Sequence, residues 1–162
     1  MCYAAALAAL RALARREILR AAFFQWMTPL VAAFCSDALA LFTGMALGRH
    51  KLAPLVSPHK TVEGAAGGLV GGMAGMAIFC LVYRAITGVN LGLPLCVALG
   101  LLGALLGELG DLSFSAVKRQ YGIKDYGRLL PGHGGVLDRF DSMVAVAPVA
   151  ELLLLVLPFA VK

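Results

Sequence analysis

Long apolar runs separated by short polar stretches make up most of this chain. Three of them, residues 64–83, 91–106 and 143–161, approach the length of about twenty residues that a helix needs to cross roughly 30 Å of hydrocarbon. A fourth run, residues 28–47, is apolar except for Ser36 and Asp37 near its middle. The pattern predicts an all-α fold, a polytopic transmembrane helical bundle with about four spanning helices.

The first 27 residues differ from these runs because arginines interrupt them. The stretch RALARREILR, residues 11–20, is too charged to span a membrane and suits an amphipathic helix that lies in the interface. We therefore expect an N-terminal basic segment, residues 1–27, forming an interfacial or partial helix, followed by a transmembrane domain, residues 28–162.

Glycines recur at helical spacing in two of the runs. Small residues four apart let helix backbones approach closely, so we expect these glycines to pack helices and assign them no chemistry. Two ridges lie within residues 64–83, formed by Gly64, Gly68 and Gly72 and by Gly67, Gly71 and Gly75, and a less regular set follows at Gly100, Gly103, Gly107 and Gly110.

Composition supports a membrane protein. Apolar residues make up 60% of the 162 and charged residues 14%, whereas soluble domains carry roughly 25% charged residues. The net charge of +5 would suggest nucleic acid for a soluble protein, but here the basic residues lie between apolar runs. Membrane lipids and nucleotide phosphates are the expected anionic partners, with no nucleic acid. The four cysteines all lie in apolar stretches without metal-ligand spacing and are expected in the core.

The basic residues between the runs predict the orientation of the chain. The segment between the third and fourth runs is rich in them, and so is the segment between the first and second, whereas the intervening segment contains only Arg84. Both basic segments should therefore face the cytoplasm. Their residues are Arg49, Lys51 and Lys60 in one, and Lys118, Arg119, Lys124, Arg128 and Arg139 in the other.

Five of the nine acidic residues fall within positions 108–141. Glu108 and Asp111 are three residues apart at the end of one run, and Asp138 and Asp141 repeat that spacing before the last run, so each pair shares a helix face. Carboxylate oxygens are hard ligands that Mg²⁺ prefers. Ion pairs with neighbouring lysines and arginines are the alternative. Asp37 lies inside an apolar run, where an acid is expensive, and is expected to face a polar cavity.

Two short motifs add groups that suit phosphate. PGHGG, residues 131–135, places glycines around His133 and lets the backbone approach an anion, although a turn with an incidental histidine explains it as well. SPHKTVEG, residues 57–64, sets Lys60 and Thr61 just before a long helix whose N-terminal amides suit phosphate. Helix capping alone accounts for Thr61, but Lys60 is unfavourable there unless an anion is nearby.

Taken together, these groups describe a cytoplasm-facing pocket with anionic ligands for a cation and cationic groups for phosphates. Phosphoryl or nucleotidyl transfer needs both. A P-loop is excluded because no GxxxxGK[ST] pattern occurs.

The stretch SAVKRQYGIKDYGRLLPGHGGVLDRFD, residues 115–141, closely resembles the hallmark of the phosphatidate cytidylyltransferases, or CDP-diacylglycerol synthases. SDALALFTG and GRHKLAPLVSPHKTVEG, within residues 36–64, resemble the family's second conserved region. His59 stands where many relatives have glycine. Family members are usually longer, so the resemblance covers their C-terminal, catalytic half.

The resemblance implies transfer of CMP from CTP to phosphatidic acid, with release of pyrophosphate, for phospholipid biosynthesis. It implies Mg²⁺ with a K⁺ companion, held by Asp111, Asp138 and Asp141. Phosphates would be contacted by Lys118, Arg119, Lys124, His133 and Arg139. Further substrate contacts would come from Ser57, Lys60, Thr61 and Ser115, with Asp37 and Asp125 orienting the cations or the metal shell. It also implies a bacterial inner-membrane location with a cytoplasmic site, and suggests a homodimer.

Three alternatives stay open. A relative using CTP on another lipid phosphate, such as an isoprenoid ether phosphate, would share the phosphate-reading residues. A transporter or channel lined by Asp37 would leave the pattern of residues 115–141 unexplained. A truncated, inactive remnant that assembles with a partner chain would keep the motif without the activity.

Overall fold

Four helices and one short hairpin make up the part of the chain that the structure describes. The computed structural model describes residues 2–123, 126 and 137–156. In chain order the elements are α1 (Cys2–Leu47), β1 (Lys51–Ala53), β2 (Ser57–Thr61), α2 (Val62–Thr87), α3 (Leu93–Gln120) and α4 (Leu137–Val156). The helices confirm the predicted all-α architecture, and the hairpin is an addition that the sequence pattern did not predict.

Within the described residues, three helices are long and apolar enough to cross a membrane: Ile18–Leu47 within α1, Val62–Thr87 and Leu93–Gln120. Such helices are typical of an integral membrane protein. In α4 the described apolar stretch, Ser142–Leu152, is shorter. A fourth span over residues 143–161 therefore stays a prediction, because its end lies outside the described residues.

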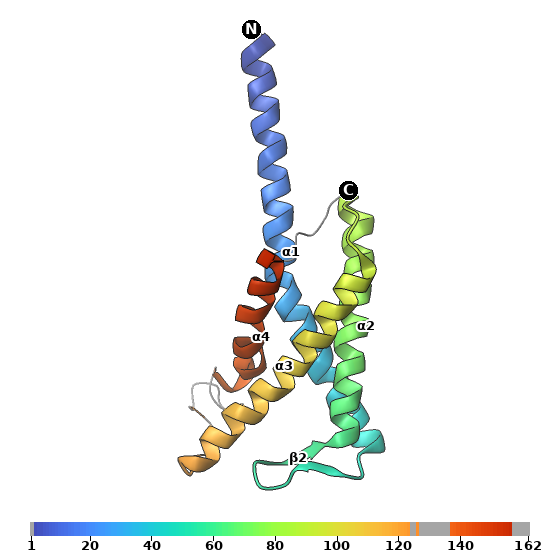
Figure 1. The fold of residues 1–162 in the computed structure, drawn as a ribbon, viewed down its shortest axis with the longest axis vertical. Coiled ribbons are helices and arrows are strands. Elements are labelled where there is room, and N and C mark those ends of the chain that lie inside the picture. The colour runs from blue at the N-terminus through green and yellow to red at the C-terminus, as the bar shows by residue number, and fades with distance from the viewer. Residues whose placement is uncertain (1, 124–125, 127–136, 157–162) are drawn as a thin grey trace.

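The N-terminal segment and the first span form one continuous helix. α1 has 46 residues, about 69 Å at the rise of an α-helix, and its N-terminal part projects beyond the other helices (Figure 1). Pro29 lies inside it, where proline removes a backbone hydrogen bond, and α1 changes direction partway along (Figure 1). The apolar stretch begins at Ile18 instead of residue 28. The interfacial position of residues 1–27 stays a prediction.

The glycine ridges pack the helices, as predicted. A Cβ on Gly71 would lie 2.6 Å from the carbonyl oxygen of Cys35 in α1, and one on Gly75 would lie 2.5 Å from the Cys35 side chain. On the other ridge, a Cβ on Gly72 would lie 2.6 Å from Ala104 Cβ and from the Gly100 carbonyl oxygen in α3. α2 therefore lies between α1 and α3 at backbone contact, which only residues without a side chain allow.

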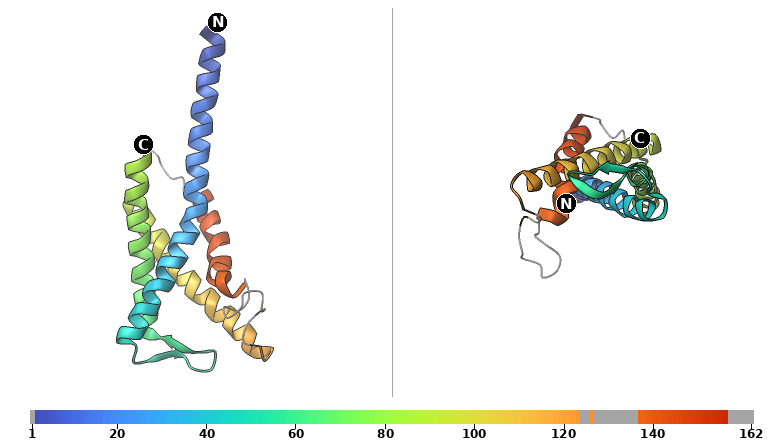
Figure 2. Two further views of the ribbon diagram at one scale, coloured as in Figure 1. Left: turned by 180° about the vertical axis from the view of Figure 1, so that it is seen from behind. Right: turned by 90° about the horizontal axis from the view of Figure 1, so that it is seen from below.

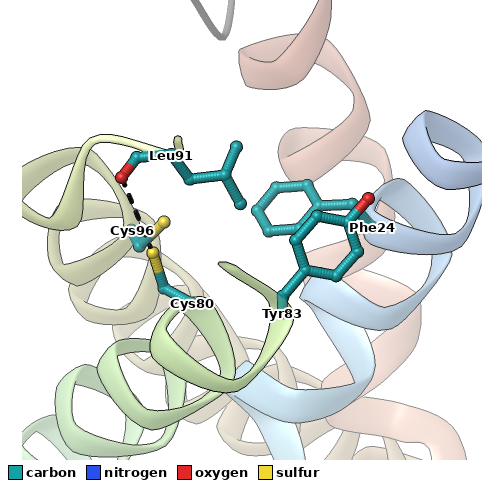
Figure 3. Close-up of a cluster of buried hydrophobic side chains, with 5 residues drawn as sticks. All are labelled: Phe24, Cys80, Tyr83, Leu91 and Cys96. Atoms are coloured by element: carbon teal, nitrogen blue, oxygen red, sulfur yellow. Dashed lines mark hydrogen bonds between the residues drawn. The ribbon is translucent and has the colours of Figure 1, made fainter. Parts of the chain in front are cut away.

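A cluster of buried side chains joins the helices at the end of α2 that leads into α3. It contains Phe24, Cys80, Tyr83, Leu91 and Cys96 (Figure 3). The Tyr83 hydroxyl donates to the carbonyl oxygen of Arg20 at 2.9 Å, which satisfies its polar end. Cys80 and Cys96 are free and buried, as expected of core residues.

The hairpin lies at the opposite end of the molecule, beside the C-terminal end of α1. β1 and β2 are antiparallel, with Lys51 opposite Thr61 and Ala53 opposite Ser57. Figures 1 and 2 show the hairpin, the C-terminal end of α3 and the start of α4 at this same end. The two basic segments of the sequence therefore begin on one side of the bundle.

Candidate functional site

Polar side chains from four segments gather inside the bundle at its hairpin end. We call this group the polar cluster. Its members are Ser36 and Asp37 of α1, Lys60 of β2, Glu108 and Asp111 of α3, and Ser142 of α4.

An ion pair between Lys60 and Asp111 links the hairpin to α3. Lys60 Nζ contacts Asp111 Oδ2, and each side chain is 26% exposed. Lys60 also interacts electrostatically with Asp37 and Glu108, and the three carboxyl groups interact with one another. One cation therefore faces three carboxyl groups, which leaves the described part of the cluster short of positive charge.

Ser142 brings the start of α4 into the cluster. Its hydroxyl donates to Asp37 Oδ2 at 3.3 Å, across 105 positions of sequence. Asp138, Arg139 and Asp141 lie in the turn of α4 just before it, but their side chains are outside the described part of the structure. The second turn of α4 therefore passes next to Asp37, which interacts with Asp111.

Two buried polar atoms of the cluster have no hydrogen-bond partner among the described residues. These atoms are Ser36 Oγ and Glu108 Oε1, and Ser36 is only 2% exposed. Both face Gly68 of α2: a Cβ there would collide with Glu108 Oε1 and lie 3.1 Å from Ser36 Oγ. An unpaired buried polar group typically costs about 1–3 kcal/mol, and more if charged, which favours a role beyond packing.

Thr61 caps α2. Its side-chain oxygen accepts a hydrogen bond from the Gly64 amide at 3.1 Å, and its backbone is extended. Glu63, in the first turn, accepts from the amides of Arg49 and His50 at 3.2 Å each, and His50 Nδ1 lies 2.7 Å from Glu63 Oε1. The capping interpretation of Thr61 is therefore confirmed, and Glu63 fastens the hairpin to the helix.

The other described candidates lie near the C-terminal end of α3 and in β2. Lys118 Nζ lies 5.4 Å from the centroid of the Tyr126 ring, and Arg119 Nε donates to the Val56 carbonyl oxygen in the hairpin turn at 3.3 Å. Ser115 is half-buried one turn after Asp111, on the same face of α3. Ser57 begins β2 and is half-buried.

Of the predicted site residues, the structure brings together Asp37, Lys60 and Asp111. Lys124, Asp125 and His133 lie outside the described residues, so their roles stay predictions. Sequence reasoning assigned no role to Ser36 or Ser142, and it paired Glu108 with Asp111 as candidate carboxylates without including Glu108 among the metal ligands. Each was signalled, since Ser36 adjoins Asp37, Ser142 adjoins Asp141, and Glu108 is three residues before Asp111.

The carboxylate oxygens of the polar cluster are suitable ligands for a divalent cation, but its described members alone do not form a complete metal site. Among the described residues, no group of three His, Cys, Asp or Glu side chains is arranged to hold a metal ion. Asp111 provides the hard oxygen donor that Mg²⁺ prefers. Positions 138 and 141 of α4, just before Ser142 in the sequence, are also aspartates and therefore carry the same type of donor. A metal centre here would therefore need ligands from α4.

Comparison with known proteins agrees with the motifs. The sequence profile described as "Cytidylyltransferase family" matches residues 1–157. The phosphatidate cytidylyltransferase of Staphylococcus saprophyticus is 44% identical over 120 residues, covering 74% of this chain and 45% of that protein. The phosphatidate cytidylyltransferase of Staphylococcus haemolyticus is 41% identical over 138 residues, covering 85% of this chain and 48% of that protein.

The chain thus spans about half the length of the curated relatives it matches. The profile covers the segments that supply the polar cluster and the run of residues 115–141. This chain belongs to the cytidylyltransferase family.

Proposed function

We propose that this chain carries the catalytic half of a phosphatidate cytidylyltransferase, which transfers CMP from CTP to phosphatidic acid and releases pyrophosphate. The observation that carries the proposal is the polar cluster, in which Lys60 and Asp111 pair across two elements beside the start of α4. The two relatives described above, which bear that name, are 44% and 41% identical over most of this chain.

In this reaction an oxygen of the lipid phosphate attacks the α-phosphorus of CTP. The new bond joins that oxygen to phosphorus, and the bond from the α-phosphorus to the oxygen leading to the β-phosphate breaks, so pyrophosphate leaves with the electron pair. No covalent intermediate on the enzyme is needed. The protein must therefore orient two anionic reactants and neutralise their charge.

The cations of the cluster and its surroundings suit that task. Lys60 pairs with Asp111, and in the proposed reaction it turns to phosphate once that carboxylate has another partner. Lys118 and Arg119 lie in the last turn of α3, and Arg119 contacts the turn of the hairpin that carries Lys60. The proposed phosphate-binding set is Lys60, Lys118, Arg119, Lys124, His133 and Arg139, with Ser57, Thr61 and Ser115 as further substrate contacts.

Mg²⁺, with K⁺ as companion, would supply charge neutralisation of the phosphate oxygens when bound. Asp111, Asp138 and Asp141 would hold it, while Asp37 and Asp125 would orient the neighbouring cations. The donation from Ser142 to Asp37 supports this assignment, because it fixes the start of α4 beside α1.

The proposal extends to the setting of the reaction. Four spans would place the cluster at the cytoplasmic surface of a bacterial inner membrane, where the lipid phosphate and CTP meet. The basic residues at the hairpin end and the bacterial relatives support that orientation. We include a homodimer in the proposal because glycine-ridged helices suit close association.

The test uses the purified chain in lipid nanodiscs with labelled CTP, Mg²⁺ and phosphatidic acid. We expect labelled CDP-diacylglycerol, and pyrophosphate only when phosphatidic acid is present. Asp138→Ala should abolish both products while the protein inserts normally, and Glu151→Gln on the same helix serves as the matched control. Pyrophosphate release without lipid, or full activity of Asp138→Ala, would refute the proposal. A parallel panel of other lipid phosphates, including an isoprenoid ether phosphate, tests the substrate.

A further inference from the structure

The turn of the hairpin carries the most exposed large apolar side chain in the described part of the chain. Leu55 is 93% exposed, and Leu52 on β1 is 36% exposed. Neither belongs to a candidate span, because the apolar stretches end at Leu47 and resume at Val62. Lipid around the spans therefore does not account for them.

A second pair of exposed apolar side chains lies at the same end of the molecule. Tyr121 and Ile123 directly follow α3 and are 76% and 39% exposed. The contact between Arg119 Nε and the Val56 carbonyl oxygen joins this end of α3 to the hairpin turn. Figures 1 and 2 show both segments at one end of the bundle. We call Leu52, Leu55, Tyr121 and Ile123 the apolar rim.

Basic residues accompany the apolar rim. Arg49 and Lys51 are exposed at the base of the hairpin, and Arg119 is exposed beside its turn. Leucine, tyrosine and isoleucine alternating with lysine and arginine are typical of segments that lie in the headgroup layer, with apolar parts buried and cations on anionic lipid. The rim also adjoins a candidate span in the sequence, since that span ends at Leu47, five residues before Leu52.

We propose that the apolar rim inserts into the headgroup layer of the bilayer, with Arg49 and Lys51 bound to anionic lipid headgroups. The occupant of this surface is the lipid bilayer and not a protein. Insertion of the rim would also position Lys60. Because β2 carries this lysine, a hairpin anchored in the headgroup layer holds it at the depth of lipid phosphates. The proposal concerns binding and is independent of the proposed function.

The natural sequence offers a direct test because it contains one tryptophan. Trp26 lies within the first candidate span and is 71% exposed, so deep bromines in brominated lipids should quench it. In the double variant Trp26→Phe/Leu55→Trp, reconstituted in nanodiscs, the fluorescent side chain reports on position 55 alone. Folding is not at risk, because Leu55 makes almost no contact with the protein.

At position 55 we expect quenching by bromines near the headgroup end of the acyl chains, at least about twofold stronger than by deep bromines, because interfacial side chains enter only about 5–10 Å. Aqueous iodide should quench it weakly. The matched control, Trp26→Phe/His59→Trp, places the reporter at an exposed polar position of the same hairpin. There we expect iodide to quench and bromolipids to have little effect.

Three results would overturn the proposal. Free access of iodide to position 55 would place the turn in water. Quenching mainly by deep bromines would place it in the hydrocarbon. Protection from both quenchers would mean that protein covers it, either a second copy or a partner chain.

A charge arm completes the test. In the position-55 reporter, Arg49→Gln/Lys51→Gln should weaken shallow quenching in nanodiscs with anionic lipid, and make little difference in purely zwitterionic ones. Equal quenching in every combination would refute the role of the two cations, and with it the proposed lipid binding.

Discussion

Lys60 and Asp111 come from different elements and meet in a site where, among the described side chains, carboxyl groups outnumber cations. The pair is half-buried, so neither charge is fully hydrated, and Asp37 and Glu108 add to the negative potential around Lys60. At the scale of single residues, the cluster is therefore held by one lysine that the proposed reaction also needs.

Lys60→Met should cost stability and activity together. Removing the cation leaves Asp111 facing other carboxyl groups, and we expect a loss of roughly 1–3 kcal/mol of unfolding free energy. Thermal unfolding in detergent measures the first effect and CDP-diacylglycerol formation the second, which should fall by about a hundredfold or more.

The double variant Lys60→Met/Asp111→Asn separates the two roles. It removes both charges, so stability should return toward the natural level while activity stays lost. Recovery of activity along with stability would show that the pair only supports the fold.

Gly68 is required because a side chain there would occupy the space of Glu108 and Ser36. Gly68→Ala should destabilise the protein by about 1–3 kcal/mol through overpacking. Gly92→Ala is the matched control, since its Cβ would meet nothing closer than Leu95 Cβ at 3.9 Å. Equal melting temperatures for the two variants would contradict the close approach at Gly68.

At the scale of elements, the hairpin and α2 act as one unit. Thr61 ends β2 and caps α2, so the same residue sets the direction of the helix and the position of Lys60 beside it. Glu63 then holds the base of the hairpin through two backbone amides and His50. A local capping motif thereby fixes a cation of the proposed site.

Thr61→Ala should cost about 0.5–2 kcal/mol of stability, because the Gly64 amide loses its acceptor. Thr61→Ser keeps an oxygen at that position and should retain most of it. Comparing CTP concentration dependence at a temperature where all variants are folded tests the proposed substrate contact. A raised KM in Thr61→Ala but not in Thr61→Ser supports that contact, and unchanged KM values in both leave Thr61 as a cap alone.

At the scale of the whole molecule, four helices converge so that segments distant in sequence share one end. The connection between α2 and α3 lies at the other end, where the aromatic and cysteine cluster closes the bundle (Figures 1 and 3). This arrangement predicts the membrane sidedness of the connections.

Single cysteines at positions 59 and 120 should react with a membrane-impermeant maleimide from one side of sealed vesicles, and a cysteine at position 90 only from the other. Positions 59, 90 and 120 are exposed and lie outside the apolar rim, so each is accessible to the reagent. Of the native cysteines, Cys80 and Cys96 are buried, and the unsubstituted chain provides the background. Labelling of positions 59 and 120 from opposite sides would contradict the shared end.

Periodicity explains how much of this could be predicted. The apolar runs, the glycine spacing and the pairing of Glu108 with Asp111 on one face follow from helix geometry, which is a property of neighbouring residues. The hairpin was not predicted because β1 and β2 are only 3 and 5 residues long, too short for a pattern to separate them from a loop. The sequence analysis did not predict that α1 continues across residue 27. The arginines before that residue suggested a separate segment lying in the membrane interface, whereas the helical backbone hydrogen bonds continue through it.

By itself, the sequence determined that this is a helical membrane protein of the cytidylyltransferase family. Composition, the lengths of the apolar runs and the spacing of the motifs can all be obtained from the sequence without knowing how the helices pack. Only the tertiary structure decided that Lys60 pairs with Asp111, that Ser142 reaches Asp37, and that Ser36 and Glu108 face Gly68. Those contacts depend on the relative positions of whole helices, which are set by glycine-to-backbone packing between distant segments and not by any local pattern.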